Sequence, residues 1–151
     1  MATIVAQPLG PSLVPPRSGD APGLLARAIQ AEREGQRSVA RQLYEQVLWA
    51  APATLTPYQC SAALVGAART YQADGETEAA LDCLEAAQVV AEVSGAYGAL
   101  GAALNARAVL AWQRGDLDEA EHLYVAAQRC AENDSDRRLV GMIAQNRGII
   151  A

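Results

Sequence analysis

The sequence predicts an all-α protein, an α-solenoid of stacked antiparallel helix pairs with seven helices in about 3.5 repeats. The first observation behind this prediction is a skeleton of a glycine, a small residue, a bulky residue and another apolar residue, which recurs at one constant spacing. Its copies are Gly35/Ala40/Tyr44/Val47, Gly75/Ala80/Leu84/Ala87 and Gly115/Ala120/Tyr124/Ala127. The second is composition, because a chain with 5% aromatic residues and abundant alanine suits closely approaching helices better than a sheet.

Each element follows from local signals. Residues 1–21 contain four prolines and show no period, which predicts a flexible tail. The repeat domain, residues 22–151, begins with an amphipathic helix over 22–34 that Gly35 ends. A second helix is predicted over 36–50, with apolar residues at i, i+3 and i+4 spacing.

The other five helices are predicted over 57–74, 76–93, 96–114, 116–132 and 136–151. The third begins with a capping-box signature, with Thr56 as the N-cap, Pro57 at the first helical position and Gln59 three residues after the cap. Asp116 and Glu119 predict a second capping box at the start of the sixth helix.

The formal net charge of −5 argues against two classes of partner. An acidic chain is repelled by phosphate backbones and by anionic membrane surfaces, so we expect neither nucleic acid nor a membrane as partner. The long uncharged run over residues 46–68 is interrupted by Pro52 and Pro57, which predicts a junction between helices rather than a membrane span. Since the N-terminus has no secretory signal pattern, we expect a cytoplasmic location.

The sequence offers little for catalysis. The three cysteines lie far apart and the chain has one histidine, so zinc-ligand spacing is absent and neither a metal nor another cofactor is expected. His122 follows Asp118 and Glu119 on one helix face, a pattern more typical of a solvated surface than of a proton relay or metal site. Because no phosphate-loop, dinucleotide, nucleophile-elbow or zinc-protease motif is present, we do not expect an enzyme.

Counted from the turn glycines, these repeats resemble the tetratricopeptide repeat (TPR) family, whose unit is a helix-turn-helix of about 34 residues. The family's small position in the first helix falls on Ala28, Ala68, Ala108 and Gly148, and its bulky position on Leu24, Leu64 and Leu104. Its second-helix pattern matches at Ala40/Tyr44, Ala80/Leu84 and Ala120/Tyr124, and its terminal proline at Pro52. The resemblance covers residues 22–151, and the longer 40-residue period implies longer helices or loops.

One register departs from the family, since Arg27, Arg107 and Arg147 stand where leucine is usual. Two interpretations are open. The arginines cover apolar surface with their stems, or they form ion pairs with acidic residues of a neighbouring unit.

The resemblance also implies that the first helix of each unit lines a concave groove. The groove positions carried over to this sequence are Leu25, Ile29, Arg33, Val65, Arg69, Gln72, Asn105, Val109, Trp112, Gln113 and Gln145. Partner binding is predicted for Arg33, Arg69, Gln72, Asn105, Val109, Trp112 and Gln145. Trp112 is either an anchor for a bound peptide or a core residue, and Arg33 or Arg69 would pair with an acidic group of the partner.

Three functions remain as hypotheses. The first is a module that binds a protein or peptide segment in the groove. The second is a scaffold that assembles as a homo-oligomer through its apolar C-terminal helix, because the chain stops within a helix four residues before the next turn position and ends on Ile149 and Ile150. The third is the sensor part of a larger regulator whose effector domain lies outside this sequence.

Overall fold

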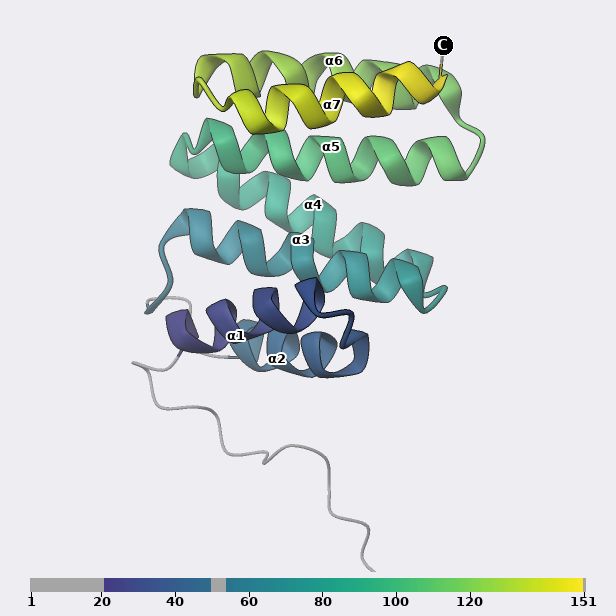
Figure 1. Cartoon of the computed structure of the whole chain (residues 1–151). Helices are drawn as coiled ribbons and strands as arrows, with labels where there is room; N and C mark the ends of the chain where they lie inside the picture. The colour runs from purple at the N-terminus through teal and green to yellow at the C-terminus, as the bar shows by residue number, and fades with distance from the viewer. Residues whose placement is uncertain (1–20, 50–53, 151) are drawn as a thin grey trace, which may run out of the picture.

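The structure, a computed structural model, describes residues 21–49 and 54–150, with the backbone alone for Ile149 and Ile150. These residues form seven helices and no strand, and each helix runs antiparallel to the next (Figure 1). The helices are α1 (Ala21–Arg33), α2 (Arg37–Trp49), α3 (Pro57–Ala73), α4 (Thr77–Ser94), α5 (Tyr97–Gln113), α6 (Leu117–Asn133) and α7 (Arg137–Ile150). The predicted all-α solenoid is therefore confirmed, and each predicted helix end lies within one residue of the observed one.

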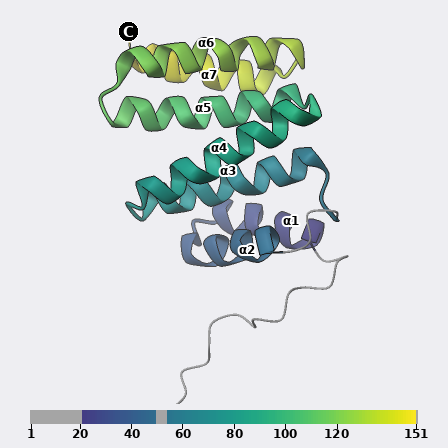
Figure 2. The ribbon, with the colours of Figure 1, turned by 180° about the vertical axis from the view of Figure 1, so that it is seen from behind.

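The solenoid has two layers. The odd-numbered helices form the layer nearer the viewer in Figure 1. The even-numbered helices form the layer nearer the viewer in Figure 2, which shows the molecule from the opposite side. Neighbouring odd helices contact one another, so α1, α3, α5 and α7 form a continuous row. The predicted tail lies outside the described residues, except for Ala21, which is buried as the first residue of α1.

Five turns share one backbone geometry. Each places one residue in the left-handed region, at Gly35, Gly75, Gly95, Gly115 and Ser135, with φ between 56° and 83°. In each, the following N–H donates to the carbonyl five residues earlier at 2.9–3.0 Å, which is the Schellman arrangement that ends a helix. From Gly75 onward the turns are evenly spaced along the chain, so from there on each repeat of the sequence pattern contains two turns at equal intervals.

The two predicted capping boxes have different outcomes. Thr56 accepts a hydrogen bond from the Gln59 N–H, and the Gln59 side chain accepts from the Thr56 N–H, which confirms the first box. Asp116 accepts from the Glu119 N–H, but its own N–H donates to the carbonyl of Ala111 as part of the turn. The second box is therefore only half formed, because the Schellman turn already uses that N–H.

Small residues occupy the helix crossings. Ala40, Ala80 and Ala120 are fully buried in three hydrophobic clusters, which also contain Tyr44, Leu84 and Tyr124 respectively. Tyr71 and Cys83 pack against both the first and the middle cluster. Alanine at these positions lets the backbones approach, as the repeat pattern predicts. Within residues 21–49 and 54–150, none of the helices combines the length and apolarity needed to cross a membrane.

Candidate binding surface

The seven residues predicted to bind a partner all lie on α1, α3, α5 and α7. We call their surface the odd-helix face, defined by Arg33, Arg69, Gln72, Asn105, Val109, Trp112 and Gln145. It belongs to the layer nearer the viewer in Figure 1. The helix pairing thus brings residues from α1 to α7 onto one row of neighbouring helices, and their surroundings divide them into two groups.

Arg69 is already engaged within the chain. Its guanidinium donates to both carboxylate oxygens of Glu32, at 2.5 and 3.0 Å, and so ties α3 to α1. The buried Tyr44 hydroxyl donates to the same carboxylate at 2.5 Å. Burial by itself raises the pKa of Glu32, but the hydrogen bonds from Arg69 and Tyr44 outweigh it and leave this pKa below its usual value. Glu32 therefore links α1, α2 and α3 as an ionised carboxylate that accepts hydrogen bonds from Tyr44 and Arg69.

Gln72 and Asn105 also link neighbouring odd helices. The Gln72 side chain on α3 donates to that of Gln113 on α5. Asn105 is 6% exposed, and its oxygen accepts from Asn146 on α7 at 3.2 Å. The predicted groove position of Asn105 therefore lies in the interior, because α7 covers it.

The second group is exposed. Trp112, at the end of α5, is 37% exposed, so part of it is accessible at the surface and the rest is covered by its neighbours. Val109 lies one helical turn before it and is half-buried, and Gln145 on α7 is exposed. Arg33 is exposed at the end of α1, and no ion pair or hydrogen bond of its side chain is found among the described residues.

The ion-pair interpretation of the unusual arginine register fits Arg147, which pairs with an acidic residue of the neighbouring unit, whereas Arg107 approaches an acidic residue of its own helix pair. Arg147 donates to Gln128 at 2.7 Å and pairs with Glu121 at 2.5 Å. Arg107 donates to Gln88, and its guanidinium lies 3.9 Å from Glu119. Both glutamines belong to even helices.

Gln88 and Gln128 are separated by the same interval as Arg107 and Arg147, so they follow the same period as the arginines. That spacing was the signal that could have identified these partners from the sequence. Arg27, the first arginine of the register, is exposed. The register is therefore a structural link between the two layers in the later units.

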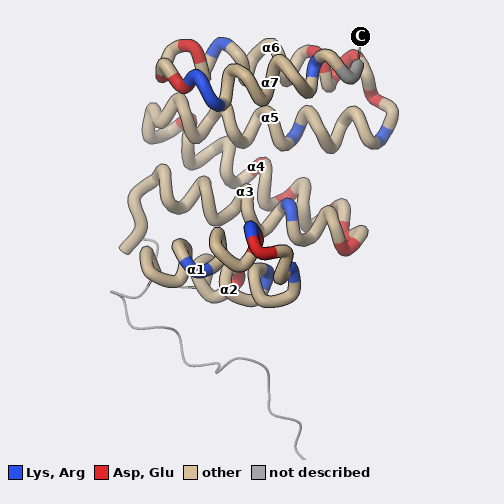
Figure 3. Tube along the Cα trace, viewed as in Figure 1, with Lys and Arg blue, Asp and Glu red and all other residues tan. Residues whose placement is uncertain are grey.

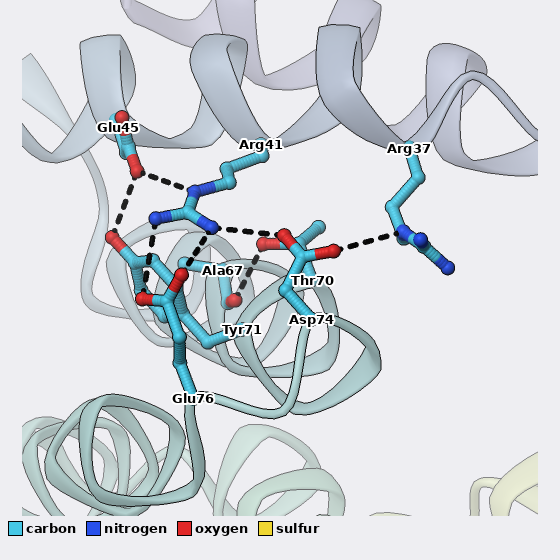
Figure 4. Close-up of polar contacts among 8 residues, drawn as sticks. All are labelled: Arg37, Arg41, Glu45, Ala67, Thr70, Tyr71, Asp74 and Glu76. Atoms are coloured by element: carbon cyan, nitrogen blue, oxygen red, sulfur yellow. Dashed lines mark hydrogen bonds and ion pairs between the residues drawn. The ribbon is translucent and has the colours of Figure 1, made fainter.

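A second polar cluster joins the first helix pair to the second (Figure 4). Arg41 of α2 pairs with Glu45, Asp74 and Glu76 at 3.0, 2.8 and 2.7 Å. Its guanidinium also lies 4.7 Å from the centre of the Tyr71 ring, within cation–π range. Because every member has a partner in this cluster, we assign it to the seam between the pairs rather than to a binding site.

Tyr71 is part of the same seam. Its hydroxyl donates to Glu45 at 3.0 Å. Burial, together with that hydrogen bond, raises the pKa of Tyr71 to about 12, so the hydroxyl remains a donor across the physiological range.

The described residues offer little reactive chemistry. Cys60, Cys83 and Cys130 are free and half-buried, and burial raises the pKa of each thiol, which lowers its reactivity. No group of three or more acidic, histidine or cysteine side chains within residues 21–49 and 54–150 is arranged to hold a metal ion. No protein-family model matches the chain, and no curated protein is significantly similar to it.

Proposed function

We propose that this chain is a protein-binding module, TPR-like in organisation, that holds a peptide or partner segment against the odd-helix face. The observation that carries the proposal is the exposure of Trp112 on this face. A tryptophan presents a large apolar surface and an N–H donor, and exposed tryptophans with half-buried apolar neighbours are typical anchors of protein interfaces. Val109 supplies that neighbour one turn away.

The surroundings of the other residues narrow the predicted site. Arg69, Gln72 and Asn105 are engaged in side-chain pairs between odd helices, so their main contribution is to hold the face in shape. Arg33 has an exposed guanidinium that can pair with an acidic group. The partner is therefore a segment with an apolar or aromatic anchor and an acidic residue.

A displayed peptide library selected on the wild-type protein tests this proposal. Each selected peptide is then titrated against Trp112→Ala and against the matched control Trp49→Ala, which removes the second tryptophan at a different surface. We expect Trp112→Ala to weaken binding by on the order of thirtyfold, as for a tryptophan hot spot. Peptides that bind Trp112→Ala as tightly as wild type would place the site elsewhere.

One observation favours self-association as an alternative. Gly101, Leu104 and Ala108 of α5 are buried under α6, whereas the residues at the same register of α7 are exposed. Those α7 residues are Gly141, Ala144 and Gly148. Sedimentation at several concentrations, with wild type and Ala144→Glu, distinguishes the two proposals: a dimer abolished by the substitution supports self-association, and a monomer throughout rejects it.

The remaining expectations belong to the same proposal. A binding module of this kind acts without catalysis and without a cofactor, and we place it in the cytoplasm. The role as sensor part of a larger regulator stays a prediction, to be decided by the length of the natural reading frame.

A further inference from the structure

Exposed apolar side chains gather at one edge of the solenoid, where α2 and α4 end and α3 and α5 begin (Figure 1). We call this surface the uncharged edge. Its members are Trp49 (72% exposed), Tyr58 (57%), Val89 (56%), Val93 (85%) and Tyr97 (52%). Single exposed apolar residues are ordinary, but a group on neighbouring helix ends indicates an interaction surface.

The edge is also free of charge over two separate parts of the sequence. Residues 46–68 and 93–106 contain no charged side chain. Since successive helices are antiparallel, the end of α2, the start of α3 and the start of α5 lie on the same side. In Figure 3 the left-hand ends of α3 and α5 are accordingly tan, whereas charged residues gather at their opposite ends. Acidic side chains border the edge: Glu45 and Glu92 precede the two stretches in sequence, and the Asp134 carboxylate lies beside Gly98 at the start of α5. Glu92 accepts a hydrogen bond from Gln88.

Three polar hydrogens are available at this edge. The hydroxyls of Tyr58 and Tyr97 and the indole N–H of Trp49 make no hydrogen bond within the part of the chain that the structure describes. Aromatic surfaces with such donors bind proline-rich segments, because a polyproline II backbone has no internal hydrogen bonds and presents its carbonyls to a partner. The edge therefore suits an uncharged, proline-rich peptide.

This chain contains such a segment. Residues 1–16 carry no charged side chain and include four prolines, and Pro8 and Pro11 have the PxxP spacing of polyproline II ligands. Its branched apolar residues are Ile4, Val5, Leu9, Leu13 and Val14. Charge begins only at Arg17, immediately after the last of these prolines. The segment thus matches the edge in both charge and residue type.

The attachment point is on the correct side. α1 begins at Ala21, and because α1 is antiparallel to α2 and α2 to α3, this residue lies at the same edge as Trp49 and Tyr58. Residues 17–20 can span about 13 Å when extended. Sixteen residues of polyproline II span about 50 Å, whereas neighbouring helices are about 10 Å apart, so the segment can cross from α1 to α5.

We propose that the uncharged edge is the docking site for residues 1–16 of the same chain, which cover Trp49, Tyr58 and Tyr97. This edge is a different surface from the one proposed to bind a partner, since Trp112 lies at the opposite end of α5. Docking of this kind shields an apolar surface that would otherwise favour aggregation.

Quenching of Trp49 fluorescence by acrylamide tests the proposal in the full chain. The chain has two tryptophans, so Trp112→Phe leaves Trp49 as the only reporter. In this background, Leu9→Asp/Leu13→Asp places two charges in the docking segment. The matched control Ser18→Asp/Gly19→Asp adds the same charge outside it. We expect a several-fold rise in the quenching constant for the first pair and no change for the second.

A second variant tests the edge itself. Val93→Ser/Tyr97→Ser removes apolar contacts without touching Trp49 and is expected to raise the quenching constant in the same way, with an unchanged helical circular dichroism spectrum. Equal quenching in the parent and in Leu9→Asp/Leu13→Asp would overturn the proposal. Protection that disappears on dilution would also overturn it, because the cover would then come from a second copy.

Discussion

Tyr44 and Tyr124 occupy the same register of the first and third helix pairs, yet their hydroxyls have different surroundings. Both side chains are buried, at 0% and 2% exposure. The Tyr44 hydroxyl donates to Glu32, which Arg69 of the next pair also holds. The Tyr124 hydroxyl makes no hydrogen bond among the described residues. Position in the repeat therefore decides burial, whereas polar contacts depend on residues that the repeat does not specify.

The same contrast distinguishes the joints of the solenoid. The first pair is tied to the second by polar clusters around Glu32 and Arg41. The joints between α4 and α5 and between α6 and α7 have tight turns at Gly95 and Ser135, together with the links that Arg107 and Arg147 make to the preceding even helix. The joints of one repeat pattern thus differ in which side chains stabilise them.

The largest expected effect is at Gly66, where an added Cβ would overlap the buried Tyr44 ring. We expect Gly66→Ala to lower the free energy of unfolding by about 3 kcal/mol through overpacking. Gly141→Ala is the control, because nothing lies within 4 Å of its added Cβ, and alanine there should stabilise the helix by up to about 1 kcal/mol. Chemical denaturation measures both.

The next unit suggests how to rescue that substitution. Leu84 and Ala106 stand at the registers of Tyr44 and Gly66. In the double variant Tyr44→Leu/Gly66→Ala, the clash is relieved and the two effects should be strongly non-additive. Simple additivity would show that the Tyr44 ring does not determine the need for glycine.

Removing single hydroxyls tests the contrast between the two tyrosines directly. We expect Tyr44→Phe to lower the free energy of unfolding by about 2 kcal/mol, because it removes a hydrogen bond to a charged, half-buried carboxylate. Tyr124→Phe should change it by less than about 0.5 kcal/mol. Equal losses in the two variants, measured by denaturation under one condition, would remove the distinction between the two pairs.

The turns provide a pair of substitutions with opposite signs. Ser135 has a φ of 56°, which a residue with a Cβ adopts at a cost, whereas Gly115 adopts 83° freely. Ser135→Gly should raise the free energy of unfolding by about 1 kcal/mol, and Gly115→Ala should lower it by about 1 kcal/mol. Thermal melts of the two variants that shift in the same direction would contradict this assignment.

The smallest expected effect is a pH dependence at Glu32. Folding lowers the pKa of this carboxyl below its ordinary value of 4.5, so its contribution to stability is present above that pH and is lost as the pH falls further. Glu32→Gln should therefore flatten the loss of stability in this acidic range. Parallel stability curves for wild type and Glu32→Gln between pH 5 and pH 3 would show that the carboxylate does not contribute.

Local signals explain why the helices were predictable. Turn glycines and the Thr56 cap act within a few residues, so the boundaries follow from short stretches of sequence. The sequence predicts a turn over residues 133–135, but it does not identify Ser135 as the residue that takes the place of the turn glycines, because serine rarely adopts the left-handed region.

The candidate site was less predictable than the helices. Register indicates which side of a helix Arg69 and Asn105 occupy. It does not indicate that Arg69 forms hydrogen bonds with Glu32, 37 residues away, or that Asn105 forms one with Asn146, 41 residues away. The exposure of Trp112 likewise depends on its neighbours in space.

Our proposal divides the odd-helix face into residues that hold its shape and one residue, Trp112, that binds the partner, and one calorimetric comparison tests that division. Stability, and affinity for a peptide selected on the wild-type protein, are measured for Arg69→Met and Trp112→Ala. We expect Arg69→Met to lower stability with affinity retained, and Trp112→Ala to lower affinity with stability retained. The opposite assignment of the two losses would contradict this division.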